Sequence, residues 1–226
     1  MIIKMVSSCF LCAALALSAS AAFADVKLKG VSVPDEVTFS GHTMVLNGAG
    51  VRSRFFIDAY VAALYLPEVS TDADGILASG SPLDIRVVII SDLVTADRFA
   101  ESAMDGFVRS THGDLGPIRP QVETIIKTFR NSLSVGDVFD LVYNPDAGTE
   151  IYRNGEPLEV VEGLDFRSAM AGIWPNKGDP SCGDGDIVVR QDFAGVNVDP
   201  FAALDNRISS GAPSGHIDQL GGDIGP

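Results

Sequence analysis

Residues 46–67 read LNGAGVRSRFFIDAYVAALYLP, and the rest of the chain can be interpreted outward from this stretch. The aromatic and β-branched residues in its second half predict a long strand, which breaks near Asp58 or Ala59 and ends at Pro67. Three residues before the strand tolerate positive φ angles and therefore predict a turn: Asn47, Gly48 and Gly50.

Arg52 stands near the start of this predicted strand. Alternation along a strand places Arg52 and Arg54 on one side, with Phe55 and Ile57 on the other. Packing alone does not call for a guanidinium on an apolar strand, so Arg52 is a candidate contact for an anionic ligand. A surface salt bridge is the alternative interpretation.

The order of the other predicted elements indicates the fold class. It lacks the regular strand–helix alternation of a parallel α/β fold, and it predicts an α+β fold in which helices cover one face of a long antiparallel sheet. The predicted elements are short strands between residues 25 and 45, a short helix that is capped within Thr71-Asp72-Ala73-Asp74 and ends at Gly80, a strand at 84–91, helices from Thr95 and Pro120, three strands between 135 and 162, and a helix from Asp165.

The first 24 residues predict a secretory signal peptide. Lys4 precedes an apolar run at residues 6–19, and Ala22-Phe23-Ala24 is a small-x-small cleavage site. The apolar run is shorter than a membrane-spanning helix requires, so we expect no membrane span after cleavage. We therefore expect a periplasmic or secreted protein.

Composition divides the remaining chain into two regions. Residues 25–174 carry the periodic patterns and form the predicted domain, whereas residues 175–226 are rich in glycine and aspartate. The second region shows little periodicity, and we expect it to be a mobile tail.

Charge and motif content exclude several functions. The formal net charge is -14, which repels nucleic acid and anionic membranes. Phosphate loops, dinucleotide fingerprints and zinc-type spacings are lacking, so we expect no cofactor and no metal. Cleavage of the signal peptide would leave Cys182 as a single cysteine, and the three scattered histidines are interpreted as solvated: His42, His112 and His216.

Four aromatic residues are candidates for the walls of a cleft between sheet and helices. Aromatic residues at these spacings also occur in ordinary cores, and that alternative stays open. The four are Tyr60, Tyr65, Phe99 and Phe107.

An ordered series of motifs between residues 25 and 174 resembles the chalcone isomerase-like family. The motifs are NGAGVRSRFF, AYVAALYLP, GFVRS, SVGD, NPDAGTEI, RNG and GLDFRSAMAGIW. The resemblance implies an open-faced sandwich, in which a long curved antiparallel sheet is covered on one face by helices. Plant enzymes of the family cyclise a chalcone to a flavanone without a cofactor, and some non-catalytic members bind fatty acids. We interpret the chain as an exported bacterial member.

The resemblance also assigns roles to individual positions. The family's arginine before the long strand matches Arg52, where it would stabilise negative charge on a carbonyl or carboxylate. The enzyme's strand threonine falls on Tyr60, and its helix tyrosine and asparagine fall near Ala103 and Ser110. Because three of the four polar positions differ, the resemblance argues against chalcone cyclisation.

Three hypotheses about function follow. The first is a non-catalytic domain that binds a small amphiphilic or aromatic molecule, such as a fatty acid. The second is an isomerase of the intramolecular lyase type acting on a phenolic or enone substrate, and the third is a structural envelope protein without a ligand. The expected ligand contacts are Arg52, Tyr60, Tyr65, Phe107 and Ser110.

Overall fold

The computed structural model describes residues 25–54, 57–131, 133–173 and 187–189. The predicted signal peptide, Cys182 and most of the predicted tail lie outside these residues. The strands are β1 (Val26–Leu28), β2 (Val31–Val33), β3 (Glu36–Phe39), β4 (His42–Arg54), β5 (Ile57–Leu66), β6 (Leu83–Ile89), β7 (Val138–Asn144), β8 (Gly148–Arg153), β9 (Glu156–Val161) and β10 (Ile187–Val189). The helices are α1 (Ala73–Ala78), α2 (Ala96–Ser110), the 3-10 turn η1 (Gly116–Ile118), α3 (Arg119–Phe129) and α4 (Leu164–Ala171).

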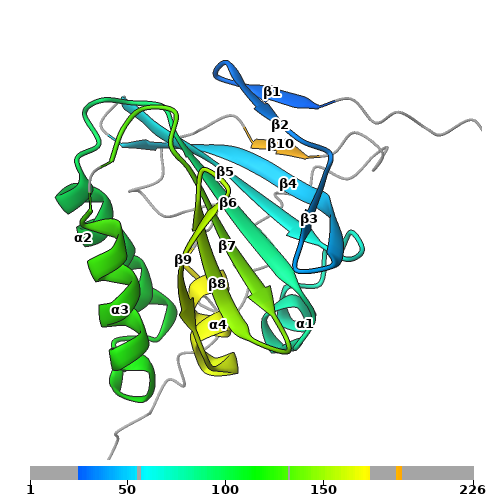
Figure 1. The fold of residues 1–226 in the computed structure, drawn as a ribbon, viewed down its shortest axis with the longest axis vertical. Helices are drawn as coiled ribbons and strands as arrows, with labels where there is room; N and C mark the ends of the chain where they lie inside the picture. Colours follow the sequence, from blue (N-terminus) through cyan, green and yellow to red (C-terminus); the bar gives the residue numbers. More distant parts are fainter. Residues whose placement is uncertain (1–24, 55–56, 132, 174–186, 190–226) are drawn as a thin grey trace, which may run out of the picture.

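The main sheet is antiparallel throughout, which confirms the predicted α+β class. Its strand order is β10-β4-β5-β6-β7-β8-β9, with β3 also paired to β4, while β1 and β2 form a separate hairpin. Figure 1 shows the curved sheet, with α2 and α3 lying together along one side of it and the β1–β2 hairpin at its upper end.

The two faces of the sheet carry separate apolar layers. The helix face includes Ala62 and Leu64 of β5, which belong to the larger core with residues of all four helices. The second face includes Val61 and Ala63, which belong to a smaller core with residues of β1, β2 and β3. Successive residues of a strand point to opposite faces, so each residue's position in β5 decides which core it joins.

The predicted turn at residues 47–50 is wrong, because these residues lie inside β4. The pairing of β4 with β5 shifts between Leu46 and Gly48, which makes Asn47 a β-bulge. Asn47 is buried, and its side-chain oxygen accepts a hydrogen bond of 2.8 Å from the amide of Ser70. Asparagine and glycine are typical of turns and of bulges alike, so composition did not separate the two.

The long strand predicted after that turn is in fact two strands. The chain reverses between Arg54 and Ile57, which face each other at the ends of β4 and β5. We expected the break a few residues later, near Asp58. Strand-forming residues stand on both sides of the reversal, so the sequence pattern did not mark its position.

Local signals elsewhere predicted the elements well. Thr95 caps α2, since its hydroxyl accepts a hydrogen bond from the amide of Arg98 at 3.3 Å. The cap of α1 is Asp72, which lies within the predicted capping segment at residues 71–74. Asn154 and Gly155 have φ angles of 53° and 81°, as the predicted two-residue hairpin turn requires.

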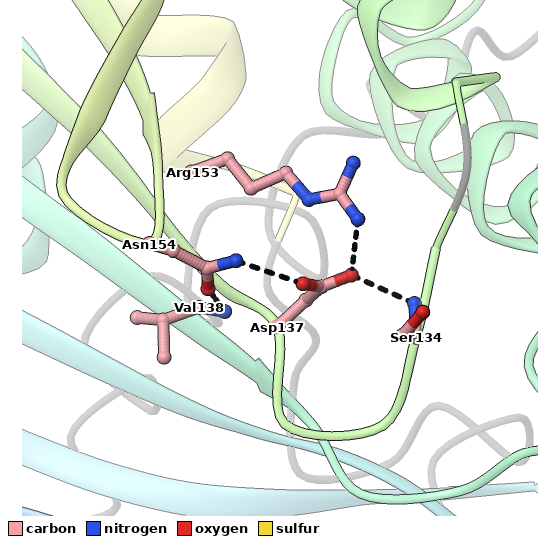
Figure 2. A network of polar contacts seen from close by, with 5 residues as sticks. All are labelled: Ser134, Asp137, Val138, Arg153 and Asn154. Carbon is pink, nitrogen blue, oxygen red and sulfur yellow. Dashed lines mark hydrogen bonds and ion pairs between the residues drawn. The ribbon is translucent and has the colours of Figure 1, made fainter.

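A polar network ties this β8–β9 turn to the start of β7, as Figure 2 shows. Asp137 accepts hydrogen bonds from Arg153 at 2.6 Å, from Asn154 at 2.9 Å and from the Ser134 amide at 2.7 Å. Burial raises the pKa of Asp137, but these hydrogen bonds outweigh that effect and hold the pKa below its ordinary value. The network fixes the end of the sheet at which β7 and the β8–β9 turn meet.

The region predicted to be a mobile tail contains a strand. Ile187–Val189 forms β10, which pairs antiparallel with β4 at Gly48–Gly50. A strand edge offers backbone N–H and C=O groups that a short extended segment can pair whatever its composition, so composition did not indicate this strand. Within the described part of the chain, no helix is long and apolar enough to cross a membrane.

Candidate functional site

A cavity of about 500 Å³ lies on the helix face, between α2 and the β4–β5 hairpin. We call it the main cavity. One wall comes from β4 and β5, the second from α2, and the third from the segment between β6 and α2. Its lining residues are Arg52, Ile57, Ala59, Tyr60, Leu93, Val94, Arg98, Phe99, Glu101, Ser102 and Asp105.

Arg52 and Tyr60 form the strand side of this cavity. They are directly paired across β4 and β5, so both side chains project from the same face. Tyr60 lies an even number of residues from Ala62 and Leu64 on β5, so it faces the helix-face core as they do. Its ring packs edge-on against the ring of Phe99, with the two ring centroids 6.0 Å apart. Both predicted contacts therefore border the main cavity.

A second and much smaller cavity adjoins the first. We call it the side cavity; its volume is about 30 Å³, and its lining residues are Arg52, Tyr60, Phe99, Ser102, Ala103, Arg109 and Ile173. Arg52 and Tyr60 line both cavities, so they stand at the junction between them. The side cavity lies toward the C-terminal end of α2.

Helix α2 contributes a polar stripe to the cavity walls. Arg98, Glu101, Ser102, Asp105 and Arg109 follow one another at spacings of one to four residues, so they lie along one flank of the helix. Arg98, Glu101 and Asp105 are exposed, yet they also border the main cavity, because the flank between the apolar and polar sides of α2 faces the β4–β5 hairpin.

The charges around the two cavities favour an anionic ligand. Three arginines line them, Arg52, Arg98 and Arg109, against two carboxylates, Glu101 and Asp105. The chain as a whole has a net charge of -14, so this region stands out from the rest of the molecule. The guanidinium of Arg98 also donates a hydrogen bond to the carbonyl of Leu93 at 3.3 Å, which connects two walls of the main cavity.

Tyr65 does not reach either cavity. It lies five residues after Tyr60 on the same strand, and an odd spacing within a strand sends its side chain to the second face. Tyr65 is fully buried there, and its hydroxyl donates a hydrogen bond of 2.9 Å to the carbonyl of Pro34. The interpretation of Tyr65 as a ligand contact is corrected to a core position.

Phe107 and Ser110 also lie away from the cavities, in the contact between α2 and α4. Phe107 is fully buried and stacks on Phe166 with ring centroids 5.4 Å apart. The hydroxyl of Ser110 donates to the carbonyl of Phe107 at 3.1 Å, and a Cβ added at Gly172 would lie 3.1 Å from the Cβ of Ser110. The structure therefore assigns both residues to helix packing.

Close packing at the C-terminal half of α2 explains the small residues within the motifs GFVRS and AMAGIW. A Cβ added at Gly106 would lie 2.5 Å from the side chain of Ile173, too close for any real contact. Ile173 in turn lines the side cavity. The small residues thus let α2 and the segment after α4 approach each other and close one end of that cavity.

The cavities offer binding groups more clearly than catalytic ones. Among the described residues, no three His, Cys, Asp or Glu side chains are grouped in a way that could hold a metal ion. Ala103, which lines the side cavity, has no polar side chain. The site combines guanidinium and hydroxyl groups with an apolar wall, which suits an anionic head attached to an apolar body.

A match to a family model agrees with this architecture. A family model described as chalcone isomerase-like matches residues 25–177, which include every described element except β10. A fatty-acid binding protein of Arabidopsis thaliana is a similar solved structure, with 16% identity, a TM-score of 0.48, and coverage of 64% of this chain and 84% of that chain. No curated protein sequence matches the chain.

Proposed function

The chain belongs to the chalcone isomerase-like family, and from that premise we propose that it binds a small amphiphilic acid, such as a fatty acid, in the main cavity. The observation that carries the proposal is the position of Arg52, which borders the cavity together with Ile57, Leu93 and Phe99. A guanidinium pairs with a carboxylate through two parallel hydrogen bonds. The apolar wall stabilises the bound chain by about 0.8 kcal/mol for each methylene group that it removes from water.

The size of the main cavity supports ligand binding over a purely structural role. The main cavity is open to solvent, since Ile57, Leu93 and Arg98 in its lining are exposed. A space of about 500 Å³ falls within the range of small-molecule sites. A structural envelope protein without a ligand would be expected to fill this space with its own side chains.

The residues around Arg52 support a non-catalytic role. The resemblance places a threonine of the enzyme at Tyr60, and it places the enzyme's helix tyrosine near Ala103. Both residues line the side cavity beside Arg52. The polar network that would position a substrate ketone and a water molecule is therefore replaced by a phenol ring and a methyl group, and we propose that chalcone cyclisation is absent.

We also propose that the protein is exported through a signal peptide at residues 1–24. The support is the sequence pattern of Lys4, the apolar run and the Ala22-Phe23-Ala24 site. Intact-mass measurement of the protein expressed with its own N-terminus tests this proposal. A mature chain that begins at Asp25 is expected, and a chain that keeps residues 1–24 would contradict it.

The binding proposal is tested by calorimetric titration with dodecanoate, together with organic extraction of the purified protein. Wild-type protein is expected to bind dodecanoate, and Arg52→Gln is expected to bind about 10- to 100-fold more weakly, because hydrogen bonds to charged groups contribute about 1.5–3 kcal/mol. Arg130→Gln is the matched control, since Arg130 is exposed at the end of α3 and lines neither cavity.

Two results would contradict the proposal. The first is a wild-type protein that yields no extractable acid and does not bind dodecanoate. The second is equal binding by Arg52→Gln and Arg130→Gln, which would show that the acid group does not contact Arg52.

A further inference from the structure

We propose that the side cavity is the compartment for the acid group and that it limits the ligand to a free carboxylate, with Arg109 and Ser102 as specificity-determining residues. This inference rests on the proposed function and specifies its ligand class. Esters, thioesters and phosphate-headed lipids are excluded by the same compartment. The apolar chain of the ligand then occupies the main cavity.

The arrangement of the two cavities sets the orientation of the ligand. Ile57, Leu93 and Val94 line only the main cavity, and they provide its apolar end near the β4–β5 reversal. Arg109 lines only the side cavity, at the opposite end of the site. A ligand whose acid group meets Arg52 at the junction can therefore place its chain along Ile57 and Leu93 with the acid group toward Arg109.

The volume of the side cavity limits what the head group can be. A water molecule needs about 10–15 Å³ of space open to the centre of a water-sized sphere. The side cavity has about 30 Å³ of such space, so it accepts roughly two water-sized groups. The two oxygens of a carboxylate match that capacity. A phosphate group has more oxygens, and an ester or thioester carries a further carbon substituent beyond the carboxyl carbon.

The polar groups around the side cavity match a carboxylate. Arg52 approaches from β4 and Arg109 from the last turn of α2, so two guanidiniums border the same small space. The hydroxyl-bearing side chains of Ser102 and Tyr60 border it as well. Guanidinium and hydroxyl groups can both donate hydrogen bonds to a carboxylate oxygen, whereas an ester oxygen without charge gains less from them.

The remaining wall of the side cavity is apolar and limits it on the side of α4. Phe99, Ala103 and Ile173 supply this wall, and the close contact of Ile173 with Gly106 holds the segment after α4 against α2. A larger head group would have to displace Ile173 or separate that contact. On this side, the compartment is therefore limited by packing that the helices themselves require.

The test compares three probes that share one chain length: dodecanoate, dodecyl phosphate and methyl dodecanoate. Binding is measured by displacement of a fluorescent fatty acid from wild-type protein, Arg109→Gln, Arg109→Lys and Ser102→Val, with Arg130→Gln as the control. We expect wild-type protein to bind dodecanoate at least about 10-fold more tightly than either other probe. Arg109→Gln is expected to weaken dodecanoate binding about 5- to 10-fold and to leave methyl dodecanoate binding nearly unchanged.

The variants separate a specificity role from a structural one. A structural role for Arg109 would weaken all three probes together, whereas the proposed role changes their ratio. Arg109→Lys keeps the charge but lacks the planar fork, so an intermediate loss of dodecanoate binding is expected. Circular dichroism and the thermal midpoint of each variant establish that it is folded.

The outcomes also separate this inference from the proposed function. If wild-type protein binds dodecanoate and Arg52→Gln does not, the proposed function stands. The inference is then overturned if dodecyl phosphate binds as tightly as dodecanoate, or if Arg109→Gln and Ser102→Val keep the selectivity of wild type. If none of the three probes binds, both the function and the inference fail.

Discussion

The polar residues on the two faces of the sheet have very different surroundings. On the helix face, Arg52 and Tyr60 border a cavity that a ligand can enter. On the second face, Arg86 and Asp140 form an ion pair of 2.6 Å across β6 and β7, and Asp84 lies beside them with a fully buried carboxyl group. The first group has access to a ligand, and the second is enclosed by β1, β2 and β3.

This difference shows that a polar residue inside an apolar strand is not by itself a sign of a binding site. Arg86 has the same kind of sequence context as Arg52, since it stands in the β-branched run DIRVVIIS. Its guanidinium lies over the ring of Tyr65 at 5.8 Å and pairs with Asp140. Whether such an arginine is available to a ligand depends on which face it points to and on what covers that face.

The largest expected effect is on stability, and it concerns Phe107, a core aromatic residue on the helix face. Phe107→Ala is expected to lower the free energy of unfolding by about 3–5 kcal/mol, because it leaves a cavity beside Phe166. Urea denaturation measures the loss. Val108→Ala is the control, since Val108 is exposed, and it should cost less than about 1 kcal/mol. A loss for Phe107→Ala as small as that of the control would contradict the assignment of Phe107 to the core.

The second prediction concerns a buried arginine that packs against backbone instead of a ligand. Arg167 is 1% exposed, and it donates to the carbonyls of Ile76 at 2.7 Å and Leu77 at 3.2 Å, in the last turn of α1. Burial lowers the pKa of Arg167 to about 10. Arg167→Met should lower the free energy of unfolding by about 2–4 kcal/mol, because it leaves the Ile76 carbonyl without this donor, while the Ser168 hydroxyl still donates to the Leu77 carbonyl at 2.9 Å.

Thermal and urea denaturation of Arg167→Met, compared with Arg130→Met at an exposed position, measure this loss. Equal stability of the two variants would show that α1 and α4 do not depend on the guanidinium. Ligand binding is expected to persist in Arg167→Met wherever the protein is folded, because Arg167 lines neither cavity.

The third prediction uses Asp137, a carboxylate with a complete set of donors (Figure 2). Its lowered pKa means that the folded state favours the charged form, so its contribution is present above the unfolded value of about 3.9 and is lost as the pH falls toward the folded pKa. Asp137→Asn should therefore cost about 2 kcal/mol at pH 7 and progressively less below pH 4. A cost that does not change with pH would contradict the role of the charge.

The fourth prediction concerns Asp84, whose contribution to stability changes with pH in the opposite direction to that of Asp137. Burial, reinforced by the charge of Asp140, raises the pKa of Asp84 well above its ordinary value, so the folded state holds this proton more tightly than the unfolded state. Its contribution is most favourable below the unfolded value of about 3.9 and is lost as the pH rises toward the folded pKa. Asp84→Asn should change stability at pH 7 by no more than about 1 kcal/mol.

The measurement for Asp84 is the slope of the unfolding free energy against pH. Asp84→Asn should remove a decline in stability between pH 4 and the folded pKa, whereas Asp137→Asn should remove a rise that ends near pH 4. If both substitutions changed the slope in the same direction, the contrast between the enclosed carboxyl and the hydrogen-bonded one would fail.

The smallest expected effect is that of Ser110→Ala. The hydroxyl of Ser110 donates to a carbonyl within its own helix, so its loss should cost less than about 0.5 kcal/mol. Dodecanoate affinity should also stay within about twofold of wild type, since Ser110 lines neither cavity. A larger loss of affinity would show that Ser110 contacts the ligand, as the sequence analysis expected.

Much of the fold could be predicted because its signals are local. Thr95, Pro120 and the Asn154-Gly155 turn mark element boundaries through caps and φ preferences of single residues. Arg52 and Tyr60 were identified as candidate contacts because a guanidinium and a phenol ring stand out on an apolar strand. The bulge at Asn47 was missed because its residue type is equally typical of a turn.

The sequence by itself determined which residues share a face within each element. Tyr60 and Tyr65 are five residues apart on one strand, and the two-residue period of a strand puts them on opposite faces. Only the tertiary structure decided that the flank of α2 carrying Arg98, Ser102 and Arg109 turns toward Arg52. The physical reason is that a strand's period is a local property, whereas the placement of a helix over a sheet depends on contacts between distant residues, such as Gly106 with Ile173.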